Sequence, residues 1–282
     1  STWDIFAIFF AHLPLGLLPH VGNKLWALKN DADQKKFITI AFIFGMILPA
    51  ITCGGILARA ILGDALLLEG ANPNHAIPEL FIATLPAWVA ALICSGVLAA
   101  VMSTADGLVV STAQIFANDI FRRTIAPKYM QKTSDARIDK IGLYISRIAT
   151  VLVLMVAIWI AWSTREMNVA LLVWIGIGGM MAATAAPMFL GVLWKGATRV
   201  GALSGFVTGG VVFSVMHGVG FDASWLGNGH LEIVGTFLEE QKINPFACAT
   251  IGGLCSIVTM YLVSQVTEKP SEEHIKRVFG ES

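Results

Sequence analysis

Long apolar stretches alternate with short polar connectors along the whole chain. A helix needs about 20 mostly apolar residues to cross a bilayer. Seven stretches reach or approach that length, the first and the sixth being the shortest. The pattern predicts membrane-spanning helices at residues 3–19, 37–62, 86–112, 141–162, 168–194, 200–217 and 246–265. Two connectors contain apolar segments of their own, and we expect a short helix within 64–85 and another over Leu231–Leu238.

The composition places the protein in a membrane. Hydrophobic residues make up 56% of the chain and charged residues 13%, whereas about a quarter of a soluble domain is charged. The four cysteines lie in apolar runs without a C-x-x-C pair, which predicts small buried residues and not a metal or redox site. No predicted span carries paired acids, an H-E-x-x-H motif or a Ser/His/Asp set. We therefore expect an integral membrane protein that is not an enzyme.

Lys and Arg are concentrated in alternate connectors. Residues 20–36, 119–140, 195–199 and the tail after the last span hold 15 of the 19 basic residues, whereas the other connectors hold only Arg165 and Lys242. The positive-inside rule makes the basic set cytoplasmic. The chain should then begin outside and end inside, in an inner or plasma membrane.

A polar stripe follows the third predicted span. Ala100, Ser103, Thr104, Gly107 and Ser111 recur at steps of three and four residues, which place them on one helical face. Polar groups within a membrane usually face a bundle interior or a water-filled cavity. Two adjacent hydroxyls and a nearby backbone carbonyl suit a small hard cation such as sodium. The alternative is that both hydroxyls only bond carbonyls of their own helix.

The first apolar stretch is interrupted by Pro14 and Gly16. Proline removes a helical hydrogen bond and clashes with the preceding turn, and interrupted helices often build the substrate sites of transporters. We hypothesise that the backbone from His12 to Gly16 borders a solute pocket, with Trp174 of the fifth span as a wall. The alternatives are a helix that simply ends at Pro19 and a histidine bonded within the bundle.

Several segments together resemble one transporter family. Leu98–Asp106, closing with Asn118–Phe121, resembles the "AAIMST…DIY" helix of the sodium/solute symporters. Residues 191–202 resemble a later helix–turn–helix segment of that family. Ile77–Leu80 and Arg59 look most like the sodium/pantothenate branch.

The resemblance implies an all-α, leucine-transporter-type fold built from two inverted five-helix repeats. Residues 1–194 would form the second repeat, residues 195–265 two additional transmembrane helices, and residues 266–282 a cytoplasmic tail. The chain has no initial Met and no signal-peptide pattern. We therefore expect a C-terminal fragment whose N-terminal half, with the first repeat, precedes Ser1.

The resemblance also implies a sodium site. Ala100 would offer its carbonyl, and Ser103 and Thr104 their hydroxyls, while the remaining ligands would come from the first repeat. We predict sodium-coupled secondary active symport of a small organic solute, a carboxylate such as pantothenate. The alternatives are proline, a monocarboxylate or a sugar as solute, and a membrane domain that senses a solute without transporting it. The expected partners are the solute, sodium, the lipid bilayer and the N-terminal half, with no nucleic acid.

Overall fold

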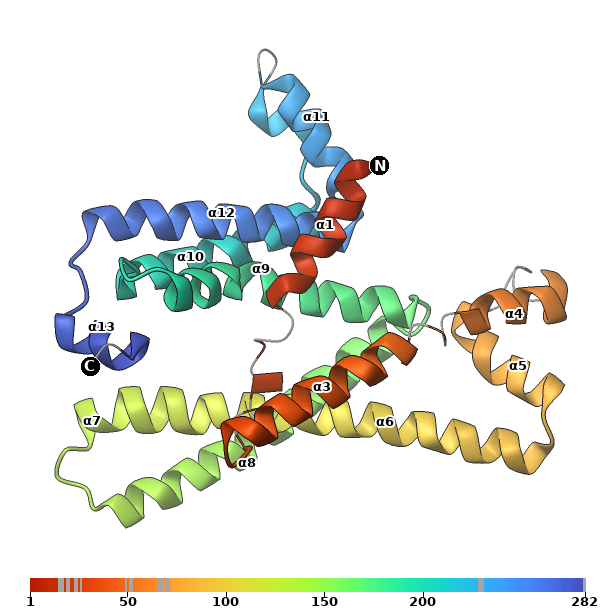
Figure 1. Ribbon diagram of the computed structural model, residues 1–282, viewed down its shortest axis with the longest axis horizontal. Coiled ribbons are helices and arrows are strands. Elements are labelled where there is room, and N and C mark those ends of the chain that lie inside the picture. The colour runs from red at the N-terminus through yellow and green to blue at the C-terminus, as the bar shows by residue number, and fades with distance from the viewer. Residues whose placement is uncertain are drawn as a thin grey trace. The chain divides into compact units, whose positions relative to one another are not determined.

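The computed structural model describes residues 1–280 except 15–17, 19–20, 23–24, 26, 49, 51–52, 65–67, 69–71 and 228–230. Within this described part every regular element is a helix, which confirms the all-α prediction. Five of the described helices are long and apolar enough to cross a membrane: Ala87–Tyr129, Asp135–Ser163, Val169–Leu193, Arg199–Gly220 and Pro245–Val266. Contacts divide the chain into two units, residues 23–168 and residues 1–22 with 169–282 (Figure 1).

The unit of residues 23–168 is dominated by two long helical segments. α6 (Ala87–Gln114) continues through the π-helix η5 (Ile115–Ile125) into α7 (Ala126–Tyr129), and α8 (Asp135–Ser163) packs back along it (Figure 1). The other helices that the structure describes in this unit are α3 (Asp31–Ile47), α4 (Cys53–Leu62), the 3-10 turn η4 (Pro73–His75) and α5 (Ala76–Thr84). α5 confirms the short helix predicted within 64–85.

The second predicted span, 37–62, is wrong as a single helix. α3 begins earlier, at Asp31, because the Asn30 side chain caps it by accepting the Asp33 N–H at 2.9 Å. It ends at Ile47, and α4 starts only at Cys53. The sequence places Pro49 between them, and a proline removes a helical hydrogen bond and disfavours the helical conformation of the residue before it.

The predicted connector 119–140 is mostly helical, and its boundaries are also wrong. In η5 the Thr124 hydroxyl donates to the Asp119 carbonyl five residues back at 2.8 Å, the spacing of a π-helix. Charged side chains on this extension form ion pairs: Arg123 pairs with Asp119 of the same element at 3.6 Å, and Arg122 pairs with Asp139 of α8 at 3.2 Å. The sequence pattern missed the extension because an apolar run shows where a helix can cross the membrane and not how far the helix continues beyond it.

The unit of residues 1–22 and 169–282 is a bundle of three long helices, α9 (Val169–Leu193), α10 (Arg199–Phe213) and α12 (Pro245–Val266). α1 (Thr2–His12) packs on α12, and the π-helix η6 (Ser214–Gly220) extends α10 (Figure 1). The shorter elements are the 3-10 turn η7 (Ala223–Leu226), α11 (Glu232–Gln241) and α13 (Glu272–Phe279). α11 confirms the helix predicted near Leu231–Leu238.

Small residues set the close approach of α10 to α12. Gly201, Gly205 and Gly209 are buried and recur every four residues on one face of α10. A Cβ on Gly205 would lie 2.9 Å from Met260 Cβ and 2.9 Å from the Ser256 carbonyl oxygen. The Ser256 hydroxyl donates to the Gly205 carbonyl at 2.7 Å. Small residues and interhelical hydrogen bonds are the usual means by which helices associate where lipid removes the hydrophobic driving force.

Candidate sodium and solute sites

The three predicted sodium ligands lie together on α6. The Ser103 hydroxyl lies 3.0 Å from the Ala100 carbonyl oxygen, and the Thr104 hydroxyl lies 3.2 Å from the same atom. All three residues are exposed in this structure. One turn of helix therefore presents three oxygens on one face, because residues three and four apart are neighbours on a helix surface.

These oxygen separations lie just below those expected around one hard cation. Oxygens that bind one ion at about 2.3–2.6 Å lie about 3.3–3.7 Å apart when they subtend a right angle. The observed separations are slightly shorter, and rotation of either hydroxyl about χ1 changes them. The same contacts are the intrahelical bonds of the alternative, in which Ser and Thr donate to a carbonyl one turn back. The two interpretations differ in what the removal of a hydroxyl does to sodium dependence.

The polar stripe continues from the ligand cluster toward η5. Gly107 is half-buried and Ser111 is buried, at 6% exposure. Beyond them a pocket of about 330 Å³ lies between η5 and α8, with Asn118 and Arg122 on one wall and Asp139 on the other. The stripe on α6 and the polar side chains that line part of this pocket therefore follow one another along the helix.

The structure brings two of the predicted solute residues into contact. The rings of His12 and Trp174 lie 4.7 Å apart, edge to face, although α1 and α9 are far apart in sequence. Phe246 at the start of α12 completes the cluster, with ring centroids 5.5 Å from His12 and 4.9 Å from Trp174. All three side chains are half-buried. We call these three residues the aromatic cluster.

The chain breaks its helix beside the aromatic cluster. α1 ends at His12, and the buried Pro14 follows within one 3-10 turn, as the interruption at this proline predicted. The predicted continuation to Pro19, including Gly16, lies outside the described residues. His12 Nδ1 lies 2.6 Å from the Ile8 carbonyl oxygen. A carbonyl only accepts, so Nδ1 carries a proton, and Nε2 is the nitrogen that remains to accept from a ligand when the ring is neutral.

α11 is held against the elements that carry the aromatic cluster. The Trp3 indole N–H of α1 donates to Gln241 Oε1 at 2.8 Å. His217 Nδ1 lies 2.7 Å from the carbonyl oxygen of Lys242, just past the end of α11. The Cys248 thiol of α12 donates to the Gln241 carbonyl at 3.3 Å. The end of α11 is thus bonded to α1, to η6 and to α12.

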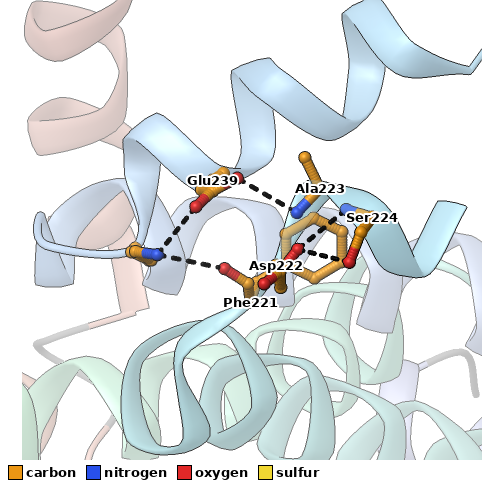
Figure 2. Close-up of polar contacts among 6 residues, drawn as sticks. Phe221, Asp222, Ala223, Ser224 and Glu239 are labelled. Atoms are coloured by element: carbon orange, nitrogen blue, oxygen red, sulfur yellow. Dashed lines mark hydrogen bonds and ion pairs between the residues drawn. The ribbon is translucent and has the colours of Figure 1, made fainter. Parts of the chain in front are cut away.

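A second set of polar contacts fixes the loop beneath α11. Glu239 accepts from the Lys242 ammonium at 3.0 Å and from the Ala223 N–H at 3.1 Å, and Asp222 accepts the Ser224 hydroxyl at 2.6 Å (Figure 2). The hydrogen bonds from Ser224 hold the pKa of Asp222 below its ordinary value. The Lys242 hydrogen bond, followed by that of Ala223, holds the pKa of Glu239 below its ordinary value. Both carboxylates stabilise this loop in their ionised form.

Sequence reasoning missed Phe246. It lies at the second position of a helix in an apolar run, and no periodic signal distinguishes it from the other residues of that run. The available signal was Asn244-Pro245, an N-cap followed by a proline at the first helical position. That signal locates the start of α12, where the Asn244 side chain accepts the Phe246 N–H at 3.0 Å. It does not indicate which helix the phenylalanine faces.

Comparison with protein families matches residues 5–209 to the model of the "Sodium:solute symporter family". The chain belongs to this family. The chain is 28% identical over 202 residues to the sodium/pantothenate symporter of Escherichia coli, and this match covers 71% of the chain and 39% of that protein. It is 32% identical over 187 residues to the sodium/proline symporter of Staphylococcus aureus, which covers 64% of the chain and 32% of that protein.

A third relative has a similar degree of identity. The chain is 29% identical over 185 residues to sodium/proline symporter 2 of Staphylococcus saprophyticus, covering 64% of the chain and 32% of the relative. The matched part therefore spans about a third of the length of these curated relatives. No solved structure matches the chain.

Proposed function

We propose that this chain contributes the second repeat and two further helices to a sodium-coupled symporter, and that sodium binds at Ala100, Ser103 and Thr104. The convergence of three oxygens on one turn of α6 carries this proposal. Membership of the sodium:solute symporter family supports sodium as the coupling ion. The remaining ligands are assigned to a first repeat, so the site is complete only in the full-length transporter.

The proposed solute is a small organic molecule with a carboxylate. The names of the relatives include both proline and pantothenate, and each of those molecules carries a carboxylate. The aromatic cluster offers flat apolar surfaces from His12, Trp174 and Phe246, and His12 adds a polar nitrogen. Ligand pockets typically combine apolar and aromatic walls with a few polar groups that fix orientation. We assign the cluster, with the chain break after it, to the wall of the solute site, and pantothenate is the first solute to test.

Coupling follows from the energetics of two ligands that share one protein. If sodium stabilises the conformation that binds solute, each ligand raises the affinity for the other by the same factor. We propose that sodium then leaves along the stripe, past Ser111, toward the pocket lined by Asn118 and Arg122. The positive-inside rule, applied to the connector charges, supports a cytoplasmic location for that end and for the C-terminus.

Uptake by proteoliposomes tests the proposal. The full-length transporter is reconstituted, and accumulation of labelled pantothenate and of labelled proline is measured with an inward sodium gradient. A potassium gradient of the same size is the control. We expect one of the two solutes to accumulate only with the sodium gradient. Sodium-dependent binding without accumulation would favour the solute-sensing alternative, and uptake that is equal in both gradients would contradict sodium coupling.

A further inference from the structure

A pocket of about 490 Å³ lies where α9 ends, α10 begins and α12 passes into the C-terminal tail. Its inner wall is apolar or small, with Pro187, Gly191 and Met260. Its mouth is charged, with the basic side chains of Arg199, Lys269 and His274 and the carboxylate of Glu268. One continuous cavity therefore passes from an apolar interior to a cationic opening.

Buried hydroxyls fix one side of this mouth. Thr198 is 3% exposed and Ser264 is fully buried. The Thr198 N–H donates to the Ser264 hydroxyl at 3.2 Å, and the Thr198 and Thr267 hydroxyls lie 2.7 Å apart. The Lys269 ammonium donates to the Ser264 carbonyl at 2.8 Å. Lys269 is thus held at the pocket by a satisfied polar network.

Two of these side chains, those of Arg199 and His274, are available to a ligand. Within the described residues, neither the Arg199 guanidinium nor the His274 ring has a hydrogen bond or an ion pair. Arg binds phosphate through two parallel N–H donors, and Lys adds a compact positive charge. The single carboxylate at the mouth, Glu268, leaves the opening with a net positive charge. This chemistry favours a phosphate group.

The surroundings distinguish a lipid phosphate from a free one. Aliphatic side chains beside the mouth are strongly exposed, among them Leu193 at 76%, Val200 at 54% and Val266 at 84%. The rings of Trp194 and Tyr261 lie 5.1 Å apart and are tilted by 34°, and the Lys269 ammonium lies 5.6 Å from the Trp194 ring. Aromatic rings mark the headgroup level of membrane proteins. The basic mouth therefore lies where the acyl-chain region gives way to headgroups.

We propose that this pocket binds the headgroup phosphate of an anionic phospholipid of the cytoplasmic leaflet, with Arg199 and Lys269 on the phosphate. Gly191 and Met260 border the space for the upper part of the lipid. The cytoplasmic leaflet carries anionic lipid, and basic pockets between membrane helices bind such headgroups. The proposal concerns the end of the bundle opposite α11 and does not depend on which solute is carried.

Native mass spectrometry of the detergent-purified full-length protein tests this site. The protein is titrated with phosphatidylglycerol and, separately, with phosphatidylcholine. Parent protein should retain phosphatidylglycerol, and the double variant Arg199→Gln/Lys269→Gln should bind it about 10- to 30-fold more weakly, as expected for two basic side chains. The variant Lys35→Gln/Lys36→Gln is the control. It removes two positive charges from the start of α3, in the connector 20–36 that is also predicted to be cytoplasmic, and it should bind phosphatidylglycerol like the parent.

A second variant fills the cavity without removing charge. A Cβ on Gly191 would have no atom within 4 Å, so Gly191→Leu adds bulk to the pocket with little strain and should also weaken phosphatidylglycerol binding. Equal binding by the parent and both pocket variants would overturn the proposal. Equal affinity for phosphatidylcholine would overturn it as well, and so would displacement of the lipid by millimolar inorganic phosphate, which would identify a free anion as the ligand.

Discussion

The glycine face of α10 makes a quantitative prediction about stability. In Gly205→Ala the new methyl group would lie 2.9 Å from Met260 Cβ, 2.9 Å from the Ser256 carbonyl oxygen and 3.2 Å from Ala186 Cβ. Ordinary contact needs about 3.5–4.0 Å, so α10 must move away from α9 and α12 by roughly half an ångström. The shift also stretches the hydrogen bond from Ser256 to the Gly205 carbonyl. Over-packing of this kind costs about 1–3 kcal/mol.

Gly210→Ala is the matched control for this substitution. It lies on the same helix, and its Cβ would meet only Ala183 Cβ, at an ordinary 3.7 Å. Both substitutions gain the same helix propensity, about 0.5–1 kcal/mol. The difference between the two variants therefore isolates the packing cost, and Gly205→Ala should be less stable than Gly210→Ala by about 1–3 kcal/mol.

The assay uses a cysteine of the same bundle. Cys248 is fully buried, so a thiol-reactive fluorogenic dye labels it only when α12 unpacks. The exposed Cys53 and the half-buried Cys94 and Cys255 are replaced by alanine to remove background labelling. The unfolding midpoint of Gly205→Ala should lie several degrees below that of Gly210→Ala. Coincident midpoints would refute the packing argument.

Three further predictions follow from other parts of the molecule. Glu239 and Asp222 have lowered pKa values, so their contribution is present above the ordinary values of 4.5 and 3.8 and is lost as pH falls through the lower folded-state values. The hydrogen-exchange protection factors of α11, taken relative to the intrinsic exchange rate at each pH, should stay constant from about pH 7 to 5 and fall below about pH 4.5, and Glu239→Gln should reduce this dependence. A single cysteine introduced at residues 130–134 should resist an impermeant thiol reagent in sealed cells, whereas one at Ser224 should react, and the reverse result would contradict the topology. Trp174→Leu should raise KM for solute uptake several-fold, whereas Trp88→Leu, which changes an exposed tryptophan of α6, should not; equal KM values would remove Trp174 from the solute site.

The sequence predicted the apolar spans well where one helix crosses without interruption. α8, α9 and α12 agree with their predicted ranges within a few residues at the end of the apolar run, because about 20 apolar residues can satisfy their backbone in lipid only as a helix. The charged helical extension through η5 was missed, since nothing in an apolar pattern requires a helix to stop where the membrane does. The apolar composition of residues 37–62 predicted one span, whereas α3 ends at Ile47 and α4 begins at Cys53.

In the candidate sites, too, the sequence predicted what depends on local periodicity and missed what depends on tertiary packing. Ala100, Ser103 and Thr104 could be grouped from sequence because helical periodicity alone places them on one face. The contact of His12 with Trp174 was not derivable that way, since it depends on which faces of α1 and α9 meet. Phe246 joined them from a helix more than 200 residues away from His12 along the chain. The Thr198–Ser264 network is likewise tertiary and has no local pattern.

Sodium dependence tests the central claim most directly. Ser103→Ala removes one hydroxyl with little change in volume, and Thr104→Ala removes one hydroxyl together with the γ-methyl group. If the hydroxyls bind sodium, the loss of one charge-assisted contact should lower sodium affinity by about 1.5–3 kcal/mol, on the order of 10- to 100-fold. Apparent solute affinity should fall at limiting sodium and recover at saturating sodium, because linkage is reciprocal.

Ser95→Ala is the matched control, because the Ser95 hydroxyl makes the same kind of bond, to the Ala91 carbonyl at 2.7 Å on the same helix. The decisive measurement is sodium titration of solute uptake by the full-length transporter carrying each of the three substitutions. We predict that the Ser103→Ala and Thr104→Ala curves shift to higher sodium while the Ser95→Ala curve matches the parent. Curves for Ser103→Ala and Thr104→Ala that overlay the parent's would contradict the sodium site and leave both hydroxyls with an intrahelical role.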